Sequence, residues 1–117
     1  MARSVSTVCE LFKANEPSTA QTPVALTAST AVYIPTVGRN VIIGITPAAN
    51  GTVKVYKGDG VAAMNDITFA VTKDKISFVE LDTSSFEILD PTNENYNSIK
   101  VTLTAQGGGT LVACNAL

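Results

Sequence analysis

An aspartate and two small hydroxyl residues follow an apolar run at a position where an acid catalyst could be presented. The run is Phe78 to Leu81, and Asp82-Thr83-Ser84 comes directly after it. Two such carboxylates, one from each lobe or subunit, could share one proton and activate a water molecule for peptide hydrolysis. One hypothesis for this chain is therefore a dimeric acid hydrolase with Asp82 as half of the catalytic pair.

The dimeric aspartic proteases of retroviruses work in this way, but two features of the sequence argue against the hypothesis. The third position of their triplet is normally glycine, and here it is Ser84. Their subunits also carry a hydrophobic-Gly-Arg-Asn signal downstream of the acid, whereas this chain has 37–40 (VGRN) upstream. We favour a structural interpretation in which Asp82, Thr83 and Ser84 cap backbone N–H groups at a turn, over one helical turn, and Phe86 returns to the core. We therefore do not expect an enzyme.

The composition excludes several other kinds of site. The chain has no histidine, which removes Ser-His-Asp and Cys-His nucleophiles and imidazole metal ligands. Eight basic and ten acidic residues give a net charge of −2 without a run of either sign, which disfavours nucleic acid. No stretch approaches the roughly 20 apolar residues of a membrane span. We accordingly expect no cofactor, no metal, no nucleic acid and no membrane partner.

The two cysteines and the first residues bear on the compartment. Cys9 and Cys114 lie near opposite ends of the sequence without CxxC spacing. In a reducing cytoplasm both would be free thiols, although neighbouring terminal strands could still allow them to pair. The start of the sequence, MARSVSTVCELFK, lacks the apolar region of a secretory signal. We expect synthesis in the cytoplasm.

Several short motifs are better explained as turns than as sites. Asn50-Gly51-Thr52 fits a glycosylation acceptor but is interpreted as a hairpin turn between two strands. The segment 57–60 (KGDG) lacks the ligand series of a calcium loop, and the glycine triplet 107–109 lacks the Lys-Ser/Thr of a phosphate loop. The polar stretch Asp90 to Asn97 is interpreted as a surface loop.

These motifs lie between segments with the period-two alternation of half-buried strands. The clearest predicted strands are 52–57, 67–72 and 99–104. The segment 41–45 (VIIGI) is apolar on both faces apart from its glycine, which predicts a central strand or one whose second face is covered. In 75–81 the apolar phase switches, which a bulge near Phe78 or burial on both sides would explain. Weaker signals predict strands over 26–34 and 110–115.

The strands and turns recur at about ten-residue spacing, as in an antiparallel sandwich or small barrel. We therefore predict an all-β fold, a single antiparallel β-sandwich or small barrel of Ig-like or jelly-roll-like type. Residues 1–22 form an N-terminal arm or edge strand in this interpretation, because 16–23 is a connector rich in proline, serine and threonine. Residues 23–117 form the sandwich. Val5 to Asn15 could be a helix or an extended strand.

With these strands placed, the order of segments resembles that of small β-sandwich virion proteins of tailed bacteriophages. The likeness covers residues ~22 to 117. The segments that carry the likeness are Val24-Ala25-Leu26-Thr27, Arg39-Asn40-Val41-Ile42-Ile43-Gly44-Ile45, a Thr-Val-Lys-Val strand, Asp66-Ile67-Thr68-Phe69-Ala70-Val71, Phe78-Val79-Glu80-Leu81-Asp82-Thr83-Ser84-Ser85-Phe86, Ser98-Ile99-Lys100-Val101-Thr102-Leu103 and an apolar terminal strand. Such proteins are found among head decoration and minor structural proteins, and the resemblance carries no catalytic residue.

The resemblance implies a capsid decoration or cement protein of the virion, which binds the major capsid protein or other virion subunits and stabilises the assembled head. We also expect homo-oligomers. The candidate interface comprises the two-faced strand and the arm, through Val41, Ile42, Ile43, Ile45, Leu11 and Phe12. A phage tail component and a cell-surface or pilus-like sandwich subunit are the alternatives, and the acid protease is a remote one.

Overall fold

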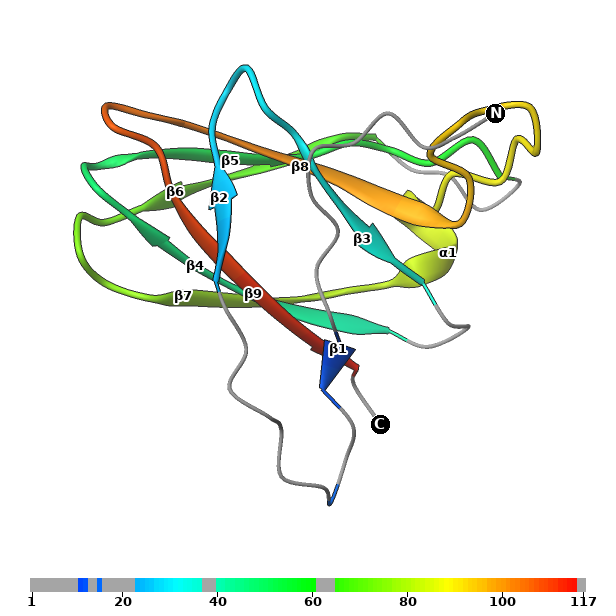
Figure 1. The fold of residues 1–117 in the computed structure, drawn as a ribbon, viewed down its shortest axis with the longest axis horizontal. Helices are drawn as coiled ribbons and strands as arrows, with labels where there is room; N and C mark the ends of the chain where they lie inside the picture. The colour runs from blue at the N-terminus through cyan, green and yellow to red at the C-terminus, as the bar shows by residue number, and fades with distance from the viewer. Residues whose placement is uncertain (1–10, 13–14, 16–22, 37–39, 61–64, 116–117) are drawn as a thin grey trace.

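The computed structural model describes residues 11–12, 15, 23–36, 40–60 and 65–115. In this part of the chain the strands form two sheets packed against one another, with one helical turn at one end (Figure 1). The predicted all-β antiparallel sandwich is confirmed. The elements in chain order are β1 (Leu11–Phe12), β2 (Val24–Leu26), β3 (Val32–Pro35), β4 (Val41–Pro47), β5 (Gly51–Val55), β6 (Ile67–Val71), β7 (Ser77–Leu81), α1 (Thr83–Phe86), β8 (Ser98–Ala105) and β9 (Gly109–Asn115).

Sheet 1, as we call the five-stranded sheet, has the order β1-β9-β4-β7. β2 pairs antiparallel with the start of β9, and β1 pairs parallel with its end, so these two short strands share one edge of β9. β4 pairs antiparallel with both β9 and β7. Sheet 2 has the order β3-β8-β5-β6, and all of its pairs are antiparallel.

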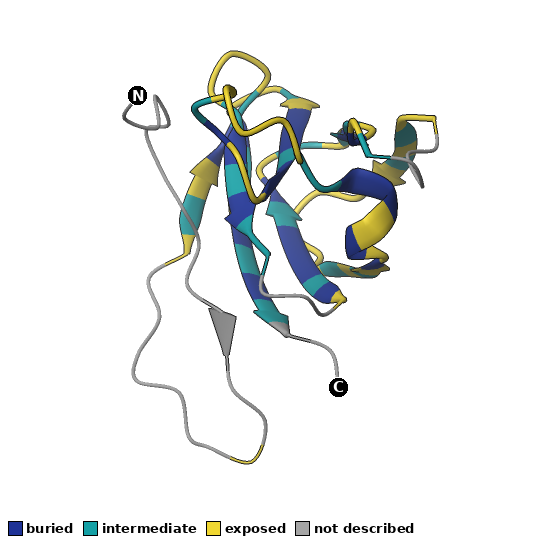
Figure 2. Cartoon of the chain, turned by 90° about the vertical axis from the view of Figure 1, so that its right-hand side faces the viewer, coloured by how far each residue is buried: buried dark blue, intermediate teal, exposed yellow. Residues whose placement is uncertain are grey.

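The core lies between the sheets and is built from alternate residues of each strand (Figure 2). Burial of this aliphatic surface is the main driving force for folding, at about 25 cal/mol per Å². The hydrophobic residues with no exposed surface are Leu26, Val32, Ile34, Val41, Ile43, Ile45, Val53, Val55, Ile99, Val101 and Leu103. The strands predicted at 41–45, 52–57, 67–72, 99–104 and 110–115 are all present, with shifted ends.

The single strand predicted over 26–34 is wrong, because this segment contributes to both sheets. β2 ends at Leu26 in sheet 1, and β3 begins at Val32 in sheet 2. Between them Thr27 Oγ1 accepts a hydrogen bond of 2.9 Å from the backbone N–H of Thr30, which closes a turn. A threonine or serine hydroxyl can thus reverse the chain without glycine or proline.

Two other local predictions need correction. Asn50 and Gly51 do not form a positive-φ hairpin turn, since neither has positive φ and the strands they join, β4 and β5, belong to different sheets. β7 contains no bulge, because its register with β4 runs without interruption from Ser77 to Leu81. The phase switch arises because Phe78 faces outward with 66% of its surface exposed, whereas Leu81 faces the core.

Most of the predicted arm lies outside the described residues. Of residues 1–22 the structure describes 11, 12 and 15, and Leu11 and Phe12 are extended as β1. Their backbones pair with Ala113 and Cys114 of β9. This observation favours the extended interpretation for these two residues. Cys9 lies outside the described part, so its pairing with Cys114 stays untested.

Candidate functional site

The carboxylate of Asp82 is the N-cap of α1. It accepts hydrogen bonds from the backbone N–H of Ser84 at 3.1 Å, from Ser84 Oγ at 2.9 Å and from Ser85 Oγ at 3.1 Å. The Ser84 hydroxyl, followed by the Ser84 N–H and the Ser85 hydroxyl, holds the pKa of Asp82 below its usual value. These contacts are those of a helix N-cap, as the sequence predicts for Asp82. Phe86 is buried after it, as predicted.

The polar loops at the α1 end of the sandwich are held by their own carboxylates and amides. Asp59 accepts hydrogen bonds from the backbone N–H groups of Leu89 and Asp90, at 2.5 and 3.1 Å, which ties two loops together. Asp90 accepts from the N–H and hydroxyl of Thr92, and these contacts lower its pKa. Within the described residues no three histidine, cysteine or acidic side chains gather to hold a metal ion. The carboxylates of these loops therefore hold the loop backbone in place.

The outer face of sheet 2 is polar and centres on a tyrosine. The ammonium groups of Lys54 and Lys100 lie 4.4 and 4.3 Å from the centroid of the Tyr56 ring, as cation–π contacts. Lys54 also forms an ion pair of 3.5 Å with Asp66. The Tyr56 ring is therefore already engaged by the chain's own cations.

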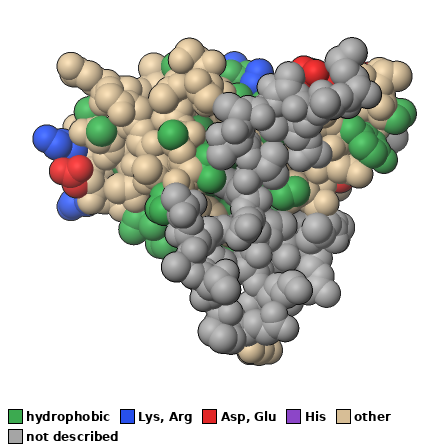
Figure 3. All heavy atoms as spheres, in the orientation of Figure 1, with side chains coloured by type: hydrophobic (Ala, Val, Ile, Leu, Met, Phe, Trp, Pro, Cys, Tyr) green, Lys and Arg blue, Asp and Glu red, His purple; other side chains and the backbone are tan. Residues whose placement is uncertain are grey.

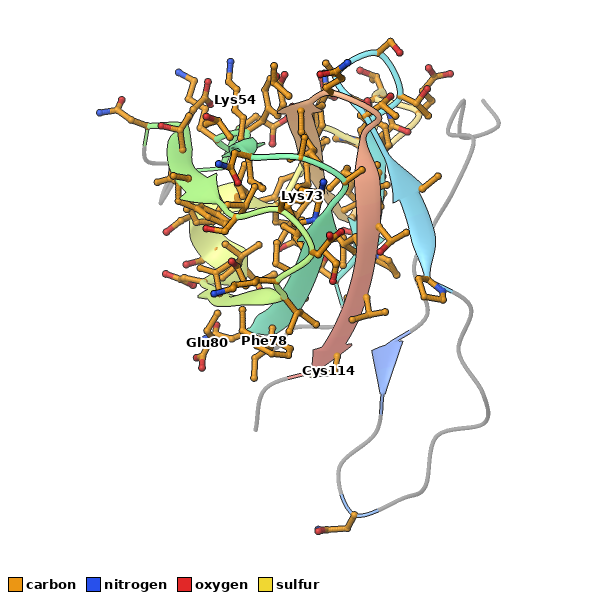
Figure 4. All side chains as sticks on the ribbon, turned by 90° about the vertical axis from the view of Figure 1, so that its left-hand side faces the viewer. Lys54, Lys73, Phe78, Glu80 and Cys114 are labelled. Carbon is orange, nitrogen blue, oxygen red and sulfur yellow. The ribbon has the colours of Figure 1, made fainter. Side chains whose placement is uncertain are left out.

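The outer face of sheet 1 is different, because it is apolar across three adjacent strands. We call this surface the apolar platform; its residues are Ile42, Gly44, Ile76, Phe78, Val112 and Cys114. The register places Phe78 and Val112 on either side of Gly44, and Glu80 and Cys114 on either side of Ile42. Figure 4 shows Phe78, Glu80 and Cys114 on one side of the molecule, with Lys54 on the opposite side. Figure 3 shows hydrophobic side chains at the lower left, where β7 runs in Figure 1.

Gly44 determines the shape of this platform. A β-carbon added at Gly44 would lie 2.8 Å from Cε1 of Phe78 and 3.1 Å from Cδ1 of Ile76. The Phe78 ring therefore leans back from β7 across the glycine on β4, as aromatic residues often cover a glycine on a neighbouring strand. Although it touches Gly44, Phe78 keeps 66% of its surface exposed, and Ile76 keeps 50%. The result is a low apolar surface with a ring lying on it.

Glu80 is the acidic neighbour of the platform. Its carboxylate accepts a hydrogen bond of 3.1 Å from Asn40 Nδ2. Across β4, Cys114 is partly exposed. At the other end of β7, the turn that leads into it carries Lys73, Asp74 and Lys75, all exposed. The two ends of the strand thus differ in the sign of their charge.

The residues predicted for an interface divide between the core and this surface. Val41, Ile43 and Ile45 have no exposed surface and pack between the sheets, so they are core residues here. Ile42 lies on the platform and is partly exposed. Leu11 and Phe12 pair through their backbones with the outer edge of β9.

Sequence reasoning missed Ile76, Phe78 and Val112 as surface residues. The available signal was the phase switch in 75–81, which placed Ile76 and Phe78 on the face opposite Leu81. Neither a bulge nor burial on both sides accounts for the switch, because the β7 register is continuous and both side chains are exposed on the outer face.

The comparisons with known proteins identify no relative. No protein-family model matches this chain, and no curated protein and no solved structure is significantly similar to it. In the described part of the chain, no helix has the length and apolar character needed to cross a membrane.

Proposed function

We propose that this chain is a non-enzymatic structural subunit that docks on a larger assembly, and more specifically a decoration protein of a tailed-phage head. The observation that carries the proposal is the apolar platform on the outer face of sheet 1. An exposed apolar patch on a small domain marks an interaction surface, since most soluble monomers avoid such patches unless they use them. The phage-specific part rests on the order of strand and turn segments in the sequence.

The platform fits a role in binding a regular, flat surface. The Phe78 ring lies against Gly44, which keeps the ring close to the sheet and leaves the centre of the platform low. In our proposal the partner is the major capsid protein or another virion subunit, and binding stabilises the shell by mass action. Tail proteins would need the same kind of surface, so this alternative is distinguished by the particle that is bound.

Phe78 supplies the largest part of the expected binding energy. An aromatic side chain of about 200 Å² with 66% exposed offers about 130 Å² for burial. At about 25 cal/mol per Å² this area is worth about 3 kcal/mol, or a hundredfold in affinity as an upper value. Phe78→Glu would remove it and place a charge in the contact.

Particle binding tests the proposal. Purified chain is added to phage heads, tails and whole particles from the strain that encodes it, after removal of its own copy, and the mixtures are separated on density gradients. We expect the chain to sediment with heads and Phe78→Glu to lose binding by about a hundredfold. Ala70→Glu is the matched control, because Ala70 is exposed on the outer face of sheet 2. If no particle retains the unmodified chain, or if Phe78→Glu binds as the control does, the proposal fails.

A further inference from the structure

β7 ends sheet 1, and its outer edge has no strand partner among the described residues. At the opposite side of this sheet, the short strands β1 and β2 both pair with β9 and form the other edge. In sheet 2 the edge strand β3 carries Pro35, which lacks the N–H that a further strand would need, and the other edge strand, β6, also has no outer partner among the described residues. An unpaired edge is a template for pairing with another chain.

The platform leaves this edge open to an approaching strand. The Phe78 ring leans over Gly44, toward β4 and away from the free side of β7. A strand added at the usual spacing of about 4.8 Å would therefore meet the backbone of β7 without displacing the ring.

We propose that two copies of this chain pair antiparallel through their β7 edges, about a two-fold axis at Phe78. This inference rests on the proposed docking function, which it extends by naming a second copy as a partner. A two-fold contact is self-complementary and closes after two copies. Sheet 1 of one copy and sheet 1 of the other then form one continuous sheet, and its outer face carries both platforms side by side.

The area of the outer face of sheet 1 is an argument for a second copy as the partner at the β7 edge. The whole outer face of sheet 1, of which the platform on β9, β4 and β7 is a part, is four strand positions wide, and its longest strands have seven residues. This face therefore measures about 19 by 23 Å, or about 440 Å². A stable specific interface uses about 800 Å² per partner. One copy offers roughly half of this area, whereas a pair offers about all of it in a single surface.

The charges of β7 select the register. With Phe78 opposite Phe78 of the second copy, Glu80 lies opposite Ile76 and close to the turn that carries Lys73 and Lys75. The two Glu80 residues are then four positions apart along the strands, or about 14 Å. A shift of the axis to Glu80 would instead place the two carboxylates directly opposite each other, which is unfavourable.

Cysteine cross-linking tests the pairing and its register without any phage particle. All variants carry Cys9→Ser and Cys114→Ser, and dimer formation under mild oxidation is followed on non-reducing gels. Residues opposite each other have Cβ atoms about 4.5–5.5 Å apart, within reach of a disulfide after a small shift, whereas 14 Å is not. We expect Phe78→Cys to form dimers at least about tenfold faster than Glu80→Cys, which lies on the same face of the same strand.

A second measurement keeps the Phe78 ring in place. In the proposed register Ser77 lies opposite Val79 of the other copy, so a mixture of Ser77→Cys and Val79→Cys should form the mixed dimer faster than either variant alone forms its own. Circular dichroism of each variant confirms that it is folded. Equal rates for Phe78→Cys and Glu80→Cys, together with no preference for the mixed dimer, would overturn the pairing.

The two proposals can fail separately. Cross-linking in solution without binding to particles would leave the β7 pair standing and remove the docking function. If the chain binds to particles but shows no register-specific cross-link, in solution or on the particle, the docking function stands and the β7 pair is removed.

Discussion

Two glycines in the sheets of this protein should lose different amounts of stability on the same small substitution. Gly51 begins β5 and pairs with Ala105 of β8. A β-carbon added there would lie 2.6 Å from Cβ of Ala105 and closer still to the backbone carbonyl oxygen of Thr104. Gly44 would place its β-carbon against the ends of the Phe78 and Ile76 side chains. The obstacle is backbone at Gly51 and movable side chain at Gly44.

The expected magnitudes follow from what has to move. In Gly51→Ala, β5 and β8 must separate by several tenths of an ångström, and overpacking of this kind costs about 1–3 kcal/mol. Part of this is offset by about 0.5–1 kcal/mol, because alanine loses less backbone entropy on folding than glycine. In Gly44→Ala the same gain opposes a side-chain rotation of Phe78 that costs about 0.5–1.5 kcal/mol. We expect a net loss of up to about 2.5 kcal/mol, centred near about 1 kcal/mol, for Gly51→Ala and a change within about 1 kcal/mol, centred near zero, for Gly44→Ala.

Urea unfolding followed by far-ultraviolet circular dichroism measures both free energies. The slope of unfolding free energy against urea should stay the same in both variants, so the difference appears in the midpoint. Thermal unfolding gives an independent value, at about 4 °C per kcal/mol for a chain of this size. If the two variants lose the same stability, or if Gly44→Ala loses more, the packing argument is wrong.

Three further substitutions test the core, the cap and the outer face of sheet 2. Leu103→Ala should cost about 3–5 kcal/mol of unfolding free energy, because Leu103 is fully buried and a cavity remains; a loss below about 1 kcal/mol would contradict its core position. The pKa of Asp82 is lowered in the folded chain, so its stabilising effect is complete above the ordinary value of 3.8 and is lost as pH falls below it. Asp82→Ala should therefore lower the free energy of unfolding at pH 7. It should also make that free energy fall less steeply as the pH is lowered, as measured by urea unfolding from pH 7 to pH 2.5. The same steepness in the variant and the unmodified chain would refute this. Tyr56→Leu should lower stability by about 1 kcal/mol through loss of two cation–π contacts, whereas Tyr56→Phe should keep most of it in the same thermal assay.

The strands of this protein could be predicted because apolar and polar residues alternate clearly along them. The pairing of the strands could not be predicted. The segments 52–57, 67–72 and 99–104 each place aliphatic or aromatic side chains on one face. Nothing local indicates that β4 pairs with β9 on one side and β7 on the other, because this order depends on the whole sandwich. Asn50-Gly51 shows the same limit, since its turn chemistry predicts a hairpin within one sheet and the chain instead crosses to the other.

Only part of the apolar platform could be predicted, because the local pattern does not show which face of a strand lies against the core. The apolar character of 41–45 on both faces was visible, but the identity of the core face was not. In the observed strand, Ile42, Gly44 and Thr46 share the outer face, and Val41 and Ile43 face inward. The glycine and the threonine were the clue to the outer phase, since neither contributes apolar volume to a core. The position of the Phe78 ring over Gly44 depends on the pairing of β7 with β4, which no local pattern encodes.

The position of β8 and β9 in the two sheets has a consequence for biosynthesis. Each lies between strands that precede it in the chain, and β9 joins residue 41 to residue 115. A nascent chain on the ribosome therefore presents β3 to β7 before the partners that complete their sheets have been translated. Pairing over such sequence separations is slow, and incomplete sheets with open edges are prone to aggregate. We infer that productive folding waits until residue 115 has left the exit tunnel, and that chaperones which hold extended apolar segments would raise the yield of soluble protein.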